Sequence, residues 1–186
     1  MMDSNTVRDH LRWVVLLARL PAEPSRHRVA VWRELRRLGA VAIGQSVWTL
    51  PDRPAATDGL QRVAELVARG GGELTLLEAD GRDQASRDRL QRLYVEARAA
   101  EWTEFRAECA RYLAEIDKEI GKGKLTVAEL EEEEQSMERL RRWHRELRAR
   151  DVLATPAAHA ADQDLKDCAA KLESYTTSVF QALNEG

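Results

Sequence analysis

The chain has 186 residues, a hydrophobic fraction of 44% and a net charge of −3, a composition that supports a packed core and excludes wholesale disorder. Cys109 and Cys168 are far apart, and the four histidines lack metal-ligand spacing, so the sequence indicates neither a disulfide framework nor a metal site. No stretch is long enough to span a bilayer, and the N-terminal apolar run does not resemble a signal peptide. We therefore expect a cytoplasmic protein with no membrane partner and no cofactor.

The charge is unevenly distributed along the chain. Residues 1–100 carry 16 arginines against 13 acidic residues, whereas residues 101–186 carry 13 basic residues against 19 acidic ones. All five lysines lie after position 117, so every basic residue of the first half is an arginine. The planar guanidinium suits phosphate and other oxyanions. A GC-rich genome would produce the same bias without any function.

The first predicted elements are a strand and a helix. The apolar run from Arg12 to Leu20 has apolar residues on both faces, which predicts a central strand covered on both sides. A helix follows from Pro24 to Gly39, since proline suits a helix start and glycine a helix end.

On a helical wheel this helix has two different sides. Its apolar side carries Val31, Leu35 and Leu38, with Trp32 at the flank. Its opposite side carries Arg26, Arg33 and Arg37, with Arg28 and Arg36 on the shoulders. This side is either a solvated outer face or an anion-binding ridge. The ridge is favoured because Glu34 alone stands nearby to neutralise the three aligned arginines.

Three further strands and a second helix complete the predicted sheet domain. The segments 40–44 and 45–50 predict two strands with a turn at Gly44-Gln45. Asp58 can cap a helix from Gly59 to Arg69, and Glu73 to Ala79 predicts a last strand with Leu74, Leu76 and Leu77 buried. The order strand, helix, strand, strand, helix, strand predicts an α+β fold, a ferredoxin-like βαββαβ domain over residues 1–82 with both helices on one face.

The remaining residues, 83–186, predict an α-helical C-terminal extension. Apolar spacing indicates a long helix over 86–120, a second helix opened by a Thr126–Glu129 capping box and ending near Arg150, and a last helix around 165–183. We expect these helices to cover the other face of the sheet or to form a dimerisation element.

No catalytic constellation is present, and the chain is not expected to be an enzyme. The acidic run from Glu131 to Glu134 is interpreted as a solvated helix face, because successive helical residues spread around the circumference. Trp13, Trp32 and Trp48 are interpreted as core residues rather than base-stacking platforms.

Several phrases resemble the N-terminal domain of ChrB, the bacterial chromate resistance regulator. They are Pro24-Ser25-Arg26, Arg28 to Arg33, Leu38-Gly39-Ala40 and Leu50 to Pro54, with Glu101-Trp102 and Glu104-Phe105 further on, and the likeness spans roughly residues 11–150. The resemblance implies a chromate-responsive transcriptional regulator. Longer family members often carry a second, C-terminal domain associated with chromate sensing, which we do not expect within these residues.

The same fold occurs in small CRISPR-associated nucleases and in the C-terminal part of the phenylacetate repressor PaaX. The nucleases place an aspartate at the end of the first strand, where this chain reads Ala18-Arg19-Leu20-Pro21. The leading hypothesis is a homodimeric regulator that binds DNA, or chromate or another oxyanion, through Arg26, Arg28, Arg33, Arg37 and Arg53. The alternatives are a metal-dependent nuclease with Glu23 or Asp52 as ligand, and a structural dimerisation partner.

Overall fold

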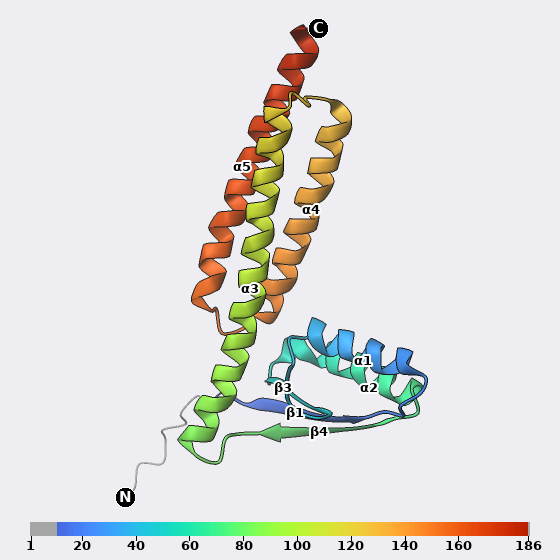
Figure 1. Ribbon diagram of the computed structural model, residues 1–186. Helices are drawn as coiled ribbons and strands as arrows, with labels where there is room; N and C mark the ends of the chain where they lie inside the picture. Colours follow the sequence, from blue (N-terminus) through green and yellow to red (C-terminus); the bar gives the residue numbers. More distant parts are fainter. Residues whose placement is uncertain (1–10, 186) are drawn as a thin grey trace, which may run out of the picture. The chain divides into compact units, whose positions relative to one another are not determined.

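The computed structural model describes residues 11–185, which divide into two compact units, one ending at Tyr94 and the other beginning at Val95 (Figure 1). The elements of the first unit are β1 (Trp13–Arg19), α1 (Ser25–Arg37), β2 (Val41–Gly44), β3 (Val47–Pro51), η1 (Pro54–Ala56), α2 (Thr57–Arg69) and β4 (Glu73–Ala79). The helix α3 (Gln84–Gly121) contains the boundary between the units. It is followed by α4 (Val127–Arg150) and α5 (Pro156–Glu185).

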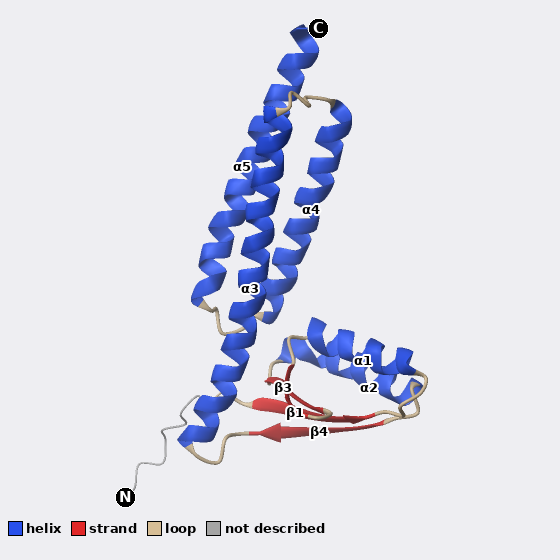
Figure 2. Ribbon diagram, in the orientation of Figure 1, coloured by secondary structure: helices blue, strands red, loops and turns tan. Residues whose placement is uncertain are grey.

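The first unit is a four-stranded antiparallel sheet with the strand order β2-β3-β1-β4. The helices α1 and α2 lie on the same face of this sheet (Figure 2). This is the predicted ferredoxin-like arrangement within an α+β chain, and β1 is central as predicted. The α-helical C-terminal part is likewise confirmed.

The core of the first unit lies between the sheet and its two helices. Alternate β1 residues, Val14, Leu16 and Ala18, point to this side and are buried against Val31 and Leu35 of α1. Successive residues of a strand face opposite sides of the sheet, so one strand with apolar residues throughout can serve two faces. Val63 and Val67 supply the equivalent apolar stripe of α2.

The predicted burial of the last strand is wrong in part. Leu76 and Leu77 are 44% and 50% exposed, and Leu74 is half-buried. The reason is that β4 is an edge strand, paired only with β1, so part of its surface has no neighbour. On the face of β1 away from α1, Trp13 is buried and its ring meets that of Tyr94, with centroids 5.9 Å apart.

The hairpin turn lies one residue later than predicted. Gly44 belongs to β2 and pairs with Val47, so Gln45 and Ser46 form the turn. Ser46 adopts a φ of 58°, the left-handed conformation found in hairpin loops that are accompanied by a bulge, and the β2–β3 register shifts between Ala42 and Gly44. The second helix also begins earlier, at Thr57, and Asp58 lies in its first turn rather than capping it.

The second unit is built from helices whose apolar stripes pack against one another. The buried core contains Trp102, Phe105, Cys109, Tyr112 and Ile116 from α3, Leu130, Met137, Leu140 and Leu147 from α4, and Ala158, Ala161, Cys168, Tyr175 and Val179 from α5. Both cysteines therefore act as small core residues. At the start of α4, Thr126 Oγ1 accepts a hydrogen bond from the backbone N–H of Glu129, which confirms the predicted cap.

The acidic run at 131–134 is not wholly solvated, contrary to the prediction. Glu133 is 8% exposed, whereas Glu131, Glu132 and Glu134 are exposed. Successive residues lie about 100° apart around a helix, so one member of a run of four faces α3 while the others face solvent.

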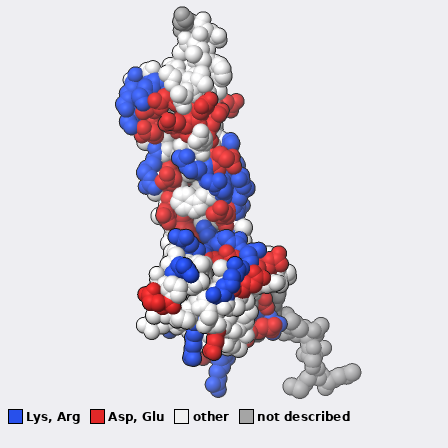
Figure 3. Space-filling view, turned by 90° about the vertical axis from the view of Figure 1, so that its right-hand side faces the viewer, with Lys and Arg blue, Asp and Glu red and all other residues white. Residues whose placement is uncertain are grey.

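Acidic and basic side chains interleave over the surface of the helices (Figure 3). Many of them form ion pairs within one helix, such as Lys118 with Glu115 and Arg145 with Glu138. Within residues 11–185, no helix combines the length and apolar character that crossing a membrane requires.

Candidate nucleic-acid interface

Helix α1 presents its basic side away from the sheet because its apolar side is fixed by packing. Val31 and Leu35 are 3% and 1% exposed, and Gly39 closes the helix with a φ of 79°. The sequence of the helix carries five arginines and one acidic residue, Glu34. A single short helix therefore concentrates positive charge on the surface of the first unit.

Three of the predicted site residues are exposed and have no acidic partner among the described residues. Arg26 and Arg33 lie two turns apart on the outward side of α1, about 10 Å along the helix axis. Arg28 is exposed at the same end of the helix as Arg26 but lies about 200° further around the helix axis. We refer to Arg26, Arg28 and Arg33 as the α1 arginine face.

Arg37 differs from these three because Glu34 neutralises it. Its guanidinium donates two hydrogen bonds to the Glu34 carboxylate, at 2.9 and 2.5 Å. Arg62 of α2 donates to the same carboxylate at 3.0 Å. Hydrogen bonding from Arg37, followed by that from Arg62, holds the pKa of Glu34 below its ordinary value. Glu34 is thus ion-paired near the C-terminal end of α1, away from Arg26 at the other end.

Trp32 is exposed, so the prediction that it is a core residue is wrong. Its side chain is 49% exposed, and Arg36 Cζ lies 5.6 Å from the centroid of its ring. Val29, one turn earlier on α1, is 42% exposed. Trp13 is buried and Trp48 is half-buried, so the core interpretation holds for the first and only partly for the second.

The fifth predicted residue, Arg53, follows β3 at the other end of the sheet from Arg26. Pro51, the last residue of β3, pairs with Trp13 at the start of β1, whereas α1 begins beyond the end of β1. Arg53 therefore lies at the end where α1 finishes. The structure brings Arg26 and Arg33 onto one helix side, with Arg28 exposed in the first turn but directed elsewhere around the axis, and it does not place Arg53 among them.

The two carboxylates of the nuclease alternative are far apart. Glu23 follows the end of β1, where its Oε2 accepts a hydrogen bond from the backbone of Ser25. The Asp52 backbone N–H donates to Arg12 O, just before the start of β1. The seven residues of β1 span about 20 Å, so these carboxylates do not share one metal ion. No group of three His, Cys, Asp or Glu side chains suited to a metal occurs among residues 11–185.

Sequence reasoning missed two members of this surface, Trp32 and Arg62. The i,i+3 spacing of Glu34 and Arg37 could have indicated their pairing. The contribution of Arg62 could not be found this way, because it comes from a different helix. The helical wheel placed Trp32 at the flank of the apolar stripe. The wheel does not show whether a neighbouring element covers that flank, and in the structure Trp32 is 49% exposed.

Comparison of the sequence with known proteins identifies a matching protein family. The family described as "Protein ChrB, N-terminal" matches residues 28–186, which begin within α1 and include all of α4 and α5. A Protein ChrB of Cupriavidus metallidurans is 28% identical over 96 residues, which are 52% of this chain and 29% of that relative. The chain thus matches less than a third of the relative's length. Because the family match extends over most of the chain, the protein belongs to the ChrB N-terminal family.

Proposed function

We propose that the protein is a regulatory factor of chromate resistance that binds nucleic acid through the α1 arginine face, and that it is not an enzyme. Membership of the ChrB family suggests the connection with chromate resistance. The binding mode is supported by the placement of the arginines on α1. DNA is the proposed partner, and chromate is the proposed ligand that modulates its binding.

The observation that carries this proposal is the position of Glu34. It is the acid of α1, and it is held by Arg37 and Arg62 at the C-terminal end of the helix. Arg26, Arg28 and Arg33 then have no acidic side chain in ion-pair contact within the described part of the chain. Arginines neutralised by nearby carboxylates contribute little to phosphate binding, so this arrangement favours anion binding over a solvated, self-neutralised surface.

The net charges of the two units agree with this assignment. Residues 11–94 carry 14 arginines and 10 acidic residues, whereas residues 95–186 carry 14 basic and 20 acidic residues. Phosphate contacts supply most of the non-specific affinity for DNA. A contact confined to the first unit is therefore expected.

The proposal is tested by measuring affinity for DNA from the chain's own operon by fluorescence anisotropy at salt concentrations from about 50 to about 200 mM. The variant replaces Arg26, Arg28 and Arg33 by alanine. Removing one phosphate contact reduces the slope of log K against log salt by about 0.9, so removing three makes the affinity ratio between these salt concentrations about 40-fold smaller. Tight binding by the wild type, with this reduced slope in the variant, supports the proposal.

The matched control replaces Arg82, Arg89 and Arg92 by alanine. These three arginines are exposed in the first unit and lie outside α1, so the change in net charge is the same. Equal reductions in both variants would mean that the helix has no special role. No binding at the lowest salt concentration would remove the nucleic-acid hypothesis altogether.

Chromate response is tested in the same assay with sulfate as the control. Both ions are tetrahedral and carry two negative charges, so an ionic-strength effect acts equally with either. Release of DNA by chromate at a concentration where sulfate has no effect is the expected result. If nucleic acid is cleaved and a chelator stops the cleavage, the protein is a nuclease and the non-enzymatic proposal is wrong.

Homodimerisation is proposed as a second property. Phe180 and Leu183, one turn apart near the end of α5, are 55% and 51% exposed. Sedimentation velocity should show a dimer that a Phe180→Ser, Leu183→Ser variant weakens. A tight dimer that binds no nucleic acid would favour a structural role instead.

A further inference from the structure

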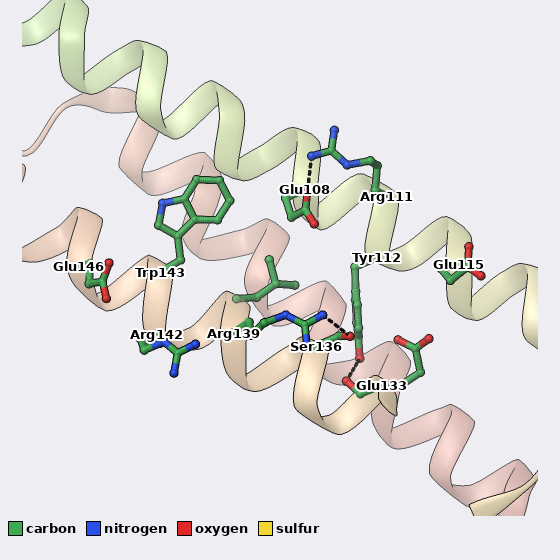
Figure 4. Close-up of a pocket in the computed structure, with 11 residues that line it drawn as sticks. Glu108, Arg111, Tyr112, Glu115, Glu133, Ser136, Arg139, Arg142, Trp143 and Glu146 are labelled. Atoms are coloured by element: carbon green, nitrogen blue, oxygen red, sulfur yellow. Dashed lines mark hydrogen bonds and ion pairs between the residues drawn. The ribbon is translucent and has the colours of Figure 1, made fainter. Parts of the chain in front are cut away.

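A groove of about 490 Å³ lies between α3 and α4, within the second unit. One end of it, shown in Figure 4, is formed by Tyr112 and Glu115 of α3 and by Glu133 of α4. Its apolar wall is supplied by Leu140 and Trp143. The volume is within the range of small-molecule sites.

Glu133 is a buried acid for which the structure provides no counter-charge. Its side chain is 8% exposed, and no described residue donates a hydrogen bond or forms an ion pair to its carboxylate. Figure 4 shows this carboxylate turned towards the end of the groove where Glu115 lies. Glu133 thus lines the groove with no hydrogen-bond or ion-pair partner among the described residues, whereas most carboxylates of largely buried residues have one.

Glu119, four residues after Glu115 on α3, is another buried acid of the same unit, and it does have positively charged partners. It is 3% exposed, and Lys124 and Lys122 approach its carboxylate at 3.1 and 3.5 Å. These contacts hold the pKa of Glu119 below its usual range. Burial raises the pKa of Glu133, and the like charges of its neighbours, Glu115 first among them, add to the effect.

The surroundings of Glu133 fit an ammonium group better than a metal ion or an anion. Glu115 offers a second carboxylate, one oxygen of which already accepts from Lys118 Nζ at 2.6 Å. Tyr112 Oη donates to the backbone O of Glu133 at 3.3 Å, so its lone pairs can accept. Three arginines also line the groove: Arg111 pairs with Glu108, Arg139 donates to the Ser136 hydroxyl, and Arg142 is the third. A metal ion would need more ligands than the described residues gather here.

We propose that this groove binds an organic ammonium ion, with the charged nitrogen at Glu133 and an apolar body along Leu140 and Trp143. An ammonium carries three donors, which match the Glu133 carboxylate, the Glu115 carboxylate and the Tyr112 hydroxyl. Binding would place a positive charge beside the Glu133 carboxylate, which has no cationic partner among the described residues. The site is independent of the α1 arginine face, so neither proposal depends on the other.

The test uses the full chain and n-hexylammonium as the probe, followed by chemical-shift changes in ¹H–¹⁵N spectra, including the Trp143 indole. For a ligand of this size we expect saturable binding with a Kd on the order of 1 mM. Two matched probes separate the contributions. 1-Hexanol has the same chain without charge, and hexanoate has the same chain with the opposite charge.

Glu133→Gln keeps the shape of the side chain and removes its charge, and it should weaken hexylammonium binding about tenfold or more. Glu131→Gln makes the same change on an exposed position of the same helix and should have no effect. Equal affinity in wild type and Glu133→Gln would overturn the proposal. So would no saturation by hexylammonium up to about 20-fold above that expected Kd, or stronger binding of hexanoate, which would make the groove an anion site.

Discussion

Replacing Glu34 by glutamine tests the charge arrangement of α1 in the opposite direction from removing arginines. Glu34 Oε1 accepts from both Arg37 and Arg62. Glutamine has nearly the same shape but no charge, so both guanidinium groups lose their ionic acceptor. If the α1 side contacts phosphates, removing this carboxylate should strengthen binding.

The size of the effect follows from the exposure of the groups. Arg37 and Arg62 side chains are 50% and 51% exposed, so each ion pair stabilises the fold by only about 0.5 kcal/mol. The variant should therefore remain folded. One additional phosphate contact steepens the slope of log K against log salt by about 0.9, which increases the affinity ratio between about 50 and about 200 mM salt about 3.5-fold.

The assay is again fluorescence anisotropy with the operon DNA, and Arg33→Ala and Glu65→Gln are the companion variants. Arg33→Ala should reduce the slope by about as much as Glu34→Gln increases it. Glu65 is an exposed acid of α2 that pairs with Arg69 of its own helix and not with an α1 arginine, and its substitution should change the slope less. If Glu34→Gln leaves both affinity and slope unchanged while the protein binds DNA, the contact surface lies elsewhere and the reasoning from α1 is refuted.

Three further predictions concern the helical unit. Trp102→Phe removes the hydrogen bond from Nε1 to buried Asp151, 2.8 Å long, and should lower the free energy of unfolding by about 1.5–3 kcal/mol in urea denaturation; an unchanged free energy would mean that this bond contributes nothing. Ile116→Ala, at a fully buried site, should cost about 2–5 kcal/mol, whereas Ile120→Ala, at 37% exposure, should cost under about 1 kcal/mol, and equal costs would contradict the assigned core. Because the pKa of Glu133 is raised by folding, its ionisation opposes folding. Glu133→Gln should therefore stabilise the protein at neutral pH, and this gain should disappear as the pH falls below the unfolded value of about 4.3. A gain that persists at about pH 3 in thermal unfolding would show that charge is not its cause.

Local sequence pattern was sufficient for the elements of this chain and for their order. The strand Glu73–Ala79 and the helix of Val31 and Leu35 follow from periodicity, which depends only on the geometry of one element. The order of the six elements then implied the ferredoxin-like topology, since few arrangements satisfy it. The arginine side of α1 was also visible, because a wheel places residues relative to their own helix axis.

The tertiary structure alone decided which of these faces are covered and by what. Trp32 is exposed and Leu77 lies on an edge strand, although both are as apolar as their buried neighbours. Glu133 is buried in a run of acids that looked uniformly solvated, and Arg62 reaches Glu34 from another helix. The physical reason is that burial and ion pairing depend on the neighbouring element. The periodicity of one element determines the direction of a side chain but not what that side chain meets.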